Sequence, residues 1–98
     1  MRNPKFQALL DELQQLHDGK NNDYATDDDP LSNLRGAARM GVNPVTGVVI
    51  RLSDKWSRIE QLIKGKSPKN ESLRDSLMDN AAYSLLAIIL LDEQDALR

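Results

Sequence analysis

An apolar stretch near the C-terminus, residues 81–91, constrains this chain most, because only Ser84 interrupts it. The stretch is about half as long as the roughly 20 apolar residues that a membrane-spanning helix needs. A helix of this composition is apolar on nearly all sides, so it must pack against more than one neighbour. The stretch therefore predicts the central helix of a helical bundle.

Apolar residues elsewhere recur at helical spacing, and turn residues separate the helices that they predict. Residues 4–17 are expected to form a first amphipathic helix that begins at Pro4 and ends at Gly19. Its apolar face consists of Phe6, Leu9, Leu10, Leu13 and Leu16. Residues 19–31 then predict a long polar loop, and long ordered loops are often functional. A short second helix is expected from Ser32 or Asn33 to Gly41.

Two longer helices are predicted in the second half of the chain. The third helix is expected from Pro44 to about Lys64, and Gly65 is its stop signal. Its buried stripe is predicted to be Leu52, Trp56, Ile59 and Ile63, and Gly47 suggests close helix packing. The fourth helix, about 70–93, would be capped by Asn70 and be about 36 Å long.

These elements predict an all-α fold, a bundle of three long helices and one short helix. With 98 residues the chain is expected to form a single domain over residues 1–98. Three partner helices barely cover the apolar part of the fourth helix. We therefore expect a homodimer or higher oligomer assembled through that helix.

Composition narrows the classes of function. The chain lacks cysteine, which excludes disulfides and thiolate metal sites, and its N-terminus shows no signal-peptide pattern. We therefore expect a soluble cytoplasmic protein without a membrane partner. A net charge of −2 argues against nucleic acid as a partner, since DNA-binding domains usually carry a basic excess.

Three carboxylates at steps of four, Glu71, Asp75 and Asp79, lead into the apolar stretch. Side chains at this spacing lie about 5–6 Å apart at Cβ, and like charges there repel. Three explanations are open. The ladder is a solvated face, or it is ion-paired with basic residues of the third helix, or it binds a divalent cation such as Mg²⁺ through one or two carboxylates.

The third helix carries a basic row at three- and four-residue steps, formed by Arg51, Lys55 and Arg58. Such a row is either a solvated face, supported by Asp54, or a phosphate clamp in which arginine supplies paired donors. An acidic metal site facing a basic row is the minimum needed to hold a metal–triphosphate. The predicted loop adds side chains suited to a base or sugar, although a plain polar turn also explains them; these are Lys20, Asn21, Asp23 and Tyr24.

Four segments in order resemble short phage proteins related to the MazG-like, all-α nucleoside triphosphate pyrophosphohydrolases. They are residues 16–24, LHDGKNNDY; residues 29–33, DPLSN; residues 51–58, RLSDKWSR; and residues 70–83, NESLRDSLMDNAAY. Together they span most of the chain. The resemblance implies an oligomeric helical bundle that acts on nucleotides.

The resemblance also implies the chemistry. The wider superfamily uses Mg²⁺ held by acids of two adjacent helices and cleaves between the α- and β-phosphates, releasing a monophosphate and pyrophosphate. Asp79 matches the final acid of the second acidic motif, and Asp75 lies one turn earlier. The first motif, Glu-Glu-x-x-Glu, is replaced here by Asp54, Lys55 and Arg58, and Ser76 stands where a Glu commonly lies.

Three hypotheses follow. In the first, the chain is a Mg²⁺-dependent (or Mn²⁺-dependent) nucleotide pyrophosphohydrolase, with Asp54, Lys55 and Asp79 as catalytic residues and Lys20, Asn21, Asp23, Tyr24, Arg51, Lys55 and Arg58 on the nucleotide. The metal ligands would be Asp54, Glu71, Asp75 and Asp79. Replacing Asp79 by Asn is expected to abolish turnover and leave the fold at least as stable, since one repulsive charge is removed. The second hypothesis is a phage protein that binds a nucleotide or nucleotide-derived signal without cleaving it, and the third is a structural or regulatory helical oligomer that touches DNA.

Overall fold

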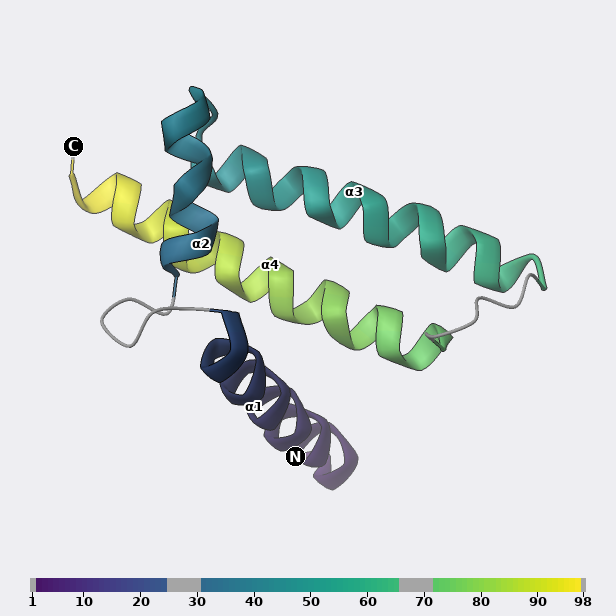
Figure 1. The fold of residues 1–98 in the computed structure, drawn as a ribbon. Coiled ribbons are helices and arrows are strands. Elements are labelled where there is room, and N and C mark those ends of the chain that lie inside the picture. The colour runs from purple at the N-terminus through teal and green to yellow at the C-terminus, as the bar shows by residue number, and fades with distance from the viewer. Residues whose placement is uncertain (1, 25–30, 66–71, 98) are drawn as a thin grey trace. The chain divides into compact units, whose positions relative to one another are not determined.

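The computed structural model describes residues 2–24, 31–65 and 72–97, which form helices and no strand (Figure 1). The all-α prediction is thus confirmed for these residues. The chain divides into two compact units, Met1–Asn33 and Leu34–Arg98, and each is described by itself. In the described parts, no helix is both long enough and apolar enough to cross a membrane.

The first unit contains the helix α1, Pro4–Tyr24. Asn3 caps its start, because the Asn3 Oδ1 atom accepts a hydrogen bond from the backbone N–H of Lys5 at 2.9 Å. The predicted end at Gly19 is wrong, since the helix continues five residues further, to Tyr24. Gly19 does not adopt the left-handed conformation that ends a helix, and its helical position costs only about 1 kcal/mol relative to alanine.

In the second unit, a short helical segment leads into a long helix. The segment consists of α2, Ser32–Arg35, which carries the boundary between the units, and the 3₁₀ helix η1, Gly36–Met40. It ends, as predicted, at Gly41, whose φ of 76° is left-handed. Gly47 permits close packing of the next helix on η1, because a Cβ atom there would lie 3.2 Å from the Cβ atom of Ala37.

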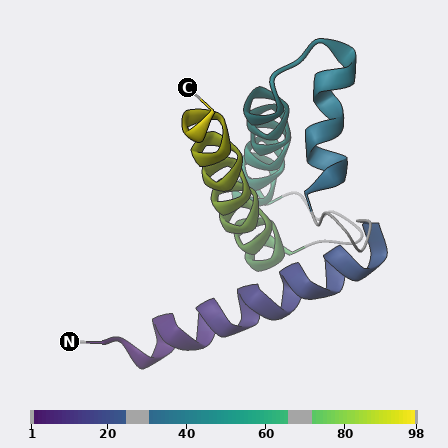
Figure 2. The same ribbon diagram turned by 90° about the vertical axis from the view of Figure 1, so that its left-hand side faces the viewer.

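The two long helices of this unit form an antiparallel pair, seen side by side in Figures 1 and 2. The helix α3, Pro44–Ile63, starts after Asn43, whose side chain accepts a hydrogen bond from the N–H of Val45. It is followed by Gly65 with a φ of 87°, so both predicted boundaries are confirmed. The helix α4, Leu73–Ala96, is capped by Ser72. The predicted cap, Asn70, lies outside the described residues.

The helices α3 and α4 pack against each other through one row of covered residues on each helix. Within each row, successive residues are three or four positions apart, which is the spacing of a coiled-coil heptad, and we call this contact the seam. The buried or half-buried positions of this seam are Val45, Val48, Leu52, Lys55, Ile59 and Leu62 on α3 and Ser76, Asn80, Tyr83, Ala87, Leu90 and Gln94 on α4. Two members of the predicted stripe do not belong to it, because Trp56 is 53% exposed and Ile63 is 70% exposed. Each follows a seam residue directly, so it points away from the seam by about 100°.

Side-chain contacts join α3 and the residues before it to the C-terminal end of α4. Asn43 and Gln94 exchange two amide hydrogen bonds, of 2.7 and 3.2 Å. Arg35 pairs with Glu93 through two donor nitrogen atoms. These contacts join the start of α3, and α2 before it, to the last turns of α4, and they set the register of the seam.

Candidate functional site

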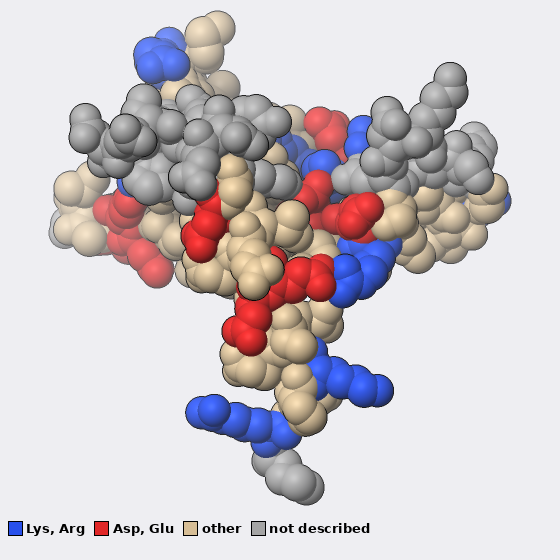
Figure 3. All heavy atoms as spheres, turned by 60° about the horizontal axis from the view of Figure 1, so that its bottom comes forward, with Lys and Arg blue, Asp and Glu red and all other residues tan. Residues whose placement is uncertain are grey.

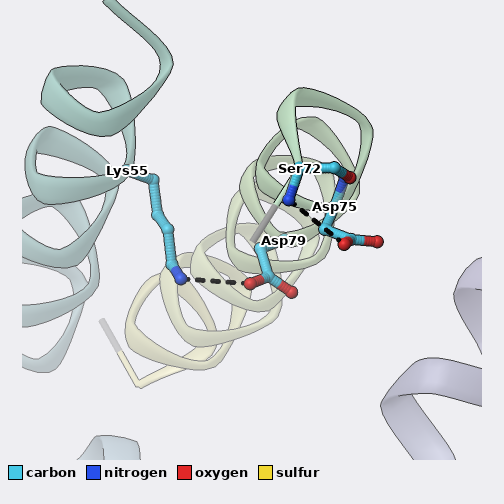
Figure 4. A network of polar contacts seen from close by, with 4 residues as sticks. All are labelled: Lys55, Ser72, Asp75 and Asp79. Atoms are coloured by element: carbon cyan, nitrogen blue, oxygen red, sulfur yellow. Dashed lines mark hydrogen bonds and ion pairs between the residues drawn. The ribbon is translucent and has the colours of Figure 1, made fainter. Parts of the chain in front are cut away.

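A partly covered ion pair beside the seam joins Lys55 of α3 to Asp79 of α4. The Lys55 Nζ atom lies 3.0 Å from the Asp79 Oδ2 atom (Figure 4). The two side chains are 21% and 15% exposed, so water screens the pair only in part. Lys55 and Asp79, two residues of the predicted site, thus lie together. They form an ion pair of the kind that the second explanation for the acidic ladder describes.

The middle carboxylate of the ladder has a different task. Asp75 and Ser72 form a capping box at the start of α4. The Ser72 Oγ atom accepts a hydrogen bond from the Asp75 N–H at 3.0 Å, and the Asp75 Oδ2 atom accepts one from the Ser72 N–H at 3.3 Å (Figure 4). The Asp75 carboxylate is therefore engaged with its own helix terminus. Glu71, the first member of the ladder, lies outside the described residues.

The three basic residues of the row on α3 differ in their exposure. Lys55 occupies a seam position, whereas Arg51 and Arg58 are exposed. The Arg51 guanidinium carbon lies 6.0 Å from the centre of the Tyr83 ring, which is at the outer limit of a cation–π contact. Asp54, also predicted as a site residue, is exposed on α3.

Two polar residues of the seam were missed by the sequence analysis. Ser76 is fully buried, with a relative exposure of 0%, and its Oγ atom has no hydrogen-bond partner among the residues that the structure describes. The buried Nδ2 atom of Asn80, one turn later, has none either. Both residues lie on the same face of α4 as Tyr83, which is three residues after Asn80, and Leu90, which is seven residues after Tyr83. That spacing is the signal from which their burial could have been found.

The described residues provide little for a resident metal ion. No group of three or more His, Asp or Glu side chains that could hold a metal occurs among them. Asp79 is held by an ammonium group and Asp75 by a backbone N–H. These residues fit only a cation that arrives with phosphate ligands of its own, since Mg²⁺ sites often consist of one or two carboxylates plus substrate phosphates and water.

The predicted nucleoside-binding residues belong to the other unit. Residues 20–24 form the last part of α1 rather than a loop, and their side chains lie outside what is described. These are Lys20, Asn21, Asp23 and Tyr24. Their closure over a nucleoside stays a prediction.

On the face shown in Figure 3, the described residues expose both acidic and basic side chains. This mixture agrees with the net charge of −2 and gives no support to the DNA-contact hypothesis. Comparisons of the chain with protein-family models, with curated proteins and with solved structures found no match. The function is therefore argued from the residues themselves.

Proposed function

We propose that this chain is a Mg²⁺-dependent nucleotide pyrophosphohydrolase, which converts (deoxy)nucleoside triphosphates into monophosphates and pyrophosphate. The observation that carries the proposal is the Lys55–Asp79 pair. Asp79 matches the final acid of the motif that the sequence resembles, and it lies beside a lysine in a mostly covered position between two helices. Ligand sites of helical bundles are built from such facing side chains.

Lys55 would bind the phosphate oxygens of a metal–triphosphate, and Asp79 would bind its metal ion. The phosphate oxygens compete with Asp79 for the ammonium group of Lys55, and Arg51 and Arg58 add positive charge from the exposed side of α3. The Asp79 carboxylate would then be one ligand of the cation that accompanies the phosphates, and Asp54, Glu71 and Asp75 are the further proposed ligands. When bound, Mg²⁺ would offset charge on the phosphoryl group and activate a water molecule.

Lys55 carries the largest share of this mechanism among the described residues. Charge that develops on the phosphate oxygens in the transition state is stabilised by a nearby cation, and partial exclusion of water strengthens the effect. Lys20, Asn21, Asp23 and Tyr24 are proposed to bind the nucleoside.

A second candidate function is capture of a nucleotide or a nucleotide-derived signal without cleavage. Two contacts favour it: the Asp79 carboxylate already has an ammonium partner, and Asp75 is part of a capping box. In this alternative the phosphates bind Lys55 and the arginines, and no metal is required.

We further propose that the chain assembles as a homodimer or higher oligomer and acts in the cytoplasm, that of the host if a phage encodes it. Large apolar side chains that are exposed on the α3–α4 pair support the assembly of several copies of the chain. Examples are Trp56 and Ile63 on α3 and Leu85 and Ile88 on α4.

The experiment that tests the proposal is a mass-spectrometric assay of the purified protein against a panel of ribo- and deoxynucleoside triphosphates, with Mg²⁺ or Mn²⁺ and an EDTA control. Monophosphate and pyrophosphate that disappear with EDTA are the expected products. Lys55→Met should abolish them, whereas Lys64→Met, which removes an exposed lysine just after α3, should not. Nucleotide binding that persists in EDTA without any product would establish capture in place of hydrolysis.

A further inference from the structure

The residues that directly follow the seam positions form a second face of the α3–α4 pair. On each helix, such a residue is rotated by about 100° from the seam residue before it. Because α3 and α4 are antiparallel and face each other, this rotation brings the two rows to the same side of the pair. We call this side the flanking face. Its large apolar residues are Val49, Trp56 and Ile63 on α3 and Leu77, Ile88 and Leu91 on α4.

The flanking face exposes enough apolar surface for a stable interface. The six side chains are between 46% and 70% exposed. Together they expose on the order of 600 Å², the upper end for an apolar patch on a monomer, whereas a stable interface buries about 800 Å² per partner. The opposite side of the pair is already used within the chain, since Gly47 packs on η1 and Glu93 pairs with Arg35. The flanking face is therefore the side on which a partner can bury apolar surface.

Small residues occupy the middle of the flanking face on both helices. Lys55 of α3 pairs with Asp79 of α4, so Ser53 lies level with Ala81 in the antiparallel pair. Ser84 belongs to the same row as Ala81. Large side chains lie on both sides of this level, Val49 and Trp56 on α3 and Leu77 and Ile88 on α4. This order of large, small and large is nearly the same in both directions along the helices, so the face fits an inverted copy of itself.

The charges along α4 favour the same antiparallel arrangement. Arg74 lies near the first turn of α4 and Asp92 near its end, both exposed and on the same edge of the flanking face. When Ala81 of one copy lies opposite Ser84 of a second, antiparallel copy, Arg74 comes within one residue of the level of Asp92. An arginine has five donors, so Arg74 can bind this carboxylate in addition to its interaction within the chain. The two-fold symmetry forms this ion pair twice.

We propose that the flanking face is a homodimer interface, in which the α4 helices of two copies pack antiparallel with Ala81 and Ser84 near the two-fold axis. Each copy contributes the same surface, as in most two-fold dimers. This interface gives the assembly proposed above a face and an orientation. It rests on that part of the proposed function and not on the hydrolase activity.

Sedimentation equilibrium of the full chain without nucleotide tests the face. The unmodified protein should be a dimer at micromolar concentration. Ile88→Glu should weaken the dimer at least about a hundredfold, because each dimer would then bury two carboxylates in an apolar interface. Ile89→Glu is the matched control, since Ile89 is 44% exposed and points about 100° away from Ile88. This control should remain a dimer, and far-UV circular dichroism should show that both variants are folded.

Arg74→Glu and Asp92→Lys test the antiparallel orientation. The two residues are about 27 Å apart along α4, so they do not contact each other within one chain. Each variant alone should dimerise at least about tenfold more weakly, because two ion pairs become like-charge pairs. An equimolar mixture of the two variants should form a heterodimer of restored affinity, since both of its pairs again have opposite charges.

The proposed interface would be overturned by an unmodified chain that is monomeric, by a dimer equally sensitive to Ile88→Glu and Ile89→Glu, or by a mixture that does not associate. A monomer whose thermal midpoint falls with Ile88→Glu would also overturn it and would indicate that α1 of the same chain covers the face. Nucleotide turnover by a monomer would keep the hydrolase and reject the interface. A dimer with the expected sensitivities but no turnover would support the interface and reject the hydrolase.

Discussion

The Lys55–Asp79 pair provides the sharpest test of how the α3–α4 seam is held together. The perturbation is a double-mutant cycle of Lys55→Met, Asp79→Leu and the two substitutions combined. Exposed ion pairs contribute about 0.2–1 kcal/mol, whereas removing one partner of a fully buried pair costs about 3–5 kcal/mol. With side chains 21% and 15% exposed, this pair lies between the two cases.

We expect each single substitution to lower the free energy of unfolding by about 2 kcal/mol, because it leaves a largely covered charge without this partner. The double variant should lie within about 1 kcal/mol of the unmodified protein, since apolar side chains of similar size suit a seam position. The interaction energy of the cycle is then at least about 3 kcal/mol, at the upper end for residues in contact.

Urea denaturation followed by far-UV circular dichroism measures these free energies. Fluorescence of Trp56, the only tryptophan, gives a second probe one residue away from Lys55. The control is the same cycle at Arg35 and Glu93, a pair whose side chains are 34% and 43% exposed. Its interaction energy should be about 0.5 kcal/mol. Equal interaction energies below about 0.5 kcal/mol in both cycles would refute the argument that coverage strengthens the Lys55–Asp79 pair.

Three further variants test the helices by denaturation midpoints. Ser72→Ala removes the capping box of α4 and should cost about 1 kcal/mol; an unchanged midpoint would mean that the cap adds nothing. Gly19→Ala should stabilise α1 by about 0.5–1 kcal/mol, because Gly19 is helical and a Cβ atom there meets nothing within 4 Å. Gly47→Leu should cost at least about 1–3 kcal/mol, since Ala37 already lies 3.2 Å from an added Cβ atom; an unaffected midpoint would contradict the tight packing.

Local chemistry made several boundaries predictable from the sequence. Pro44 fits the first turn of a helix, and Gly41 and Gly65 adopt the left-handed conformation that other residues avoid. Gly19 failed as a stop signal because nothing in its neighbourhood imposes that conformation. Glycine permits a helix end but does not require one.

The seam was misplaced because it contains a lysine. A count of apolar residues selects Leu52, Trp56, Ile59 and Ile63, which are themselves at helical spacing. The structure instead places Lys55 in the seam, where its ammonium group pairs with Asp79 of the other helix. A partner 24 residues away is invisible to the periodicity of one helix. Ser76 and Asn80 were missed for a related reason, since polar residues on a helix are ordinarily expected at its surface.

The ion pair also changes how an activity test of Asp79 must be interpreted. From the ladder alone, Asp79→Asn relieves repulsion and should leave the fold at least as stable. Next to Lys55 the same change removes an attraction, so we expect a less stable protein, and loss of turnover would then follow from either a lost ligand or a weakened seam. The double variant Lys55→Met/Asp79→Leu separates these causes, because its fold should be nearly as stable as the original. A stable double variant that neither cleaves nor binds nucleotides would assign the pair to the site, whereas one that retains full turnover would assign it to the fold alone.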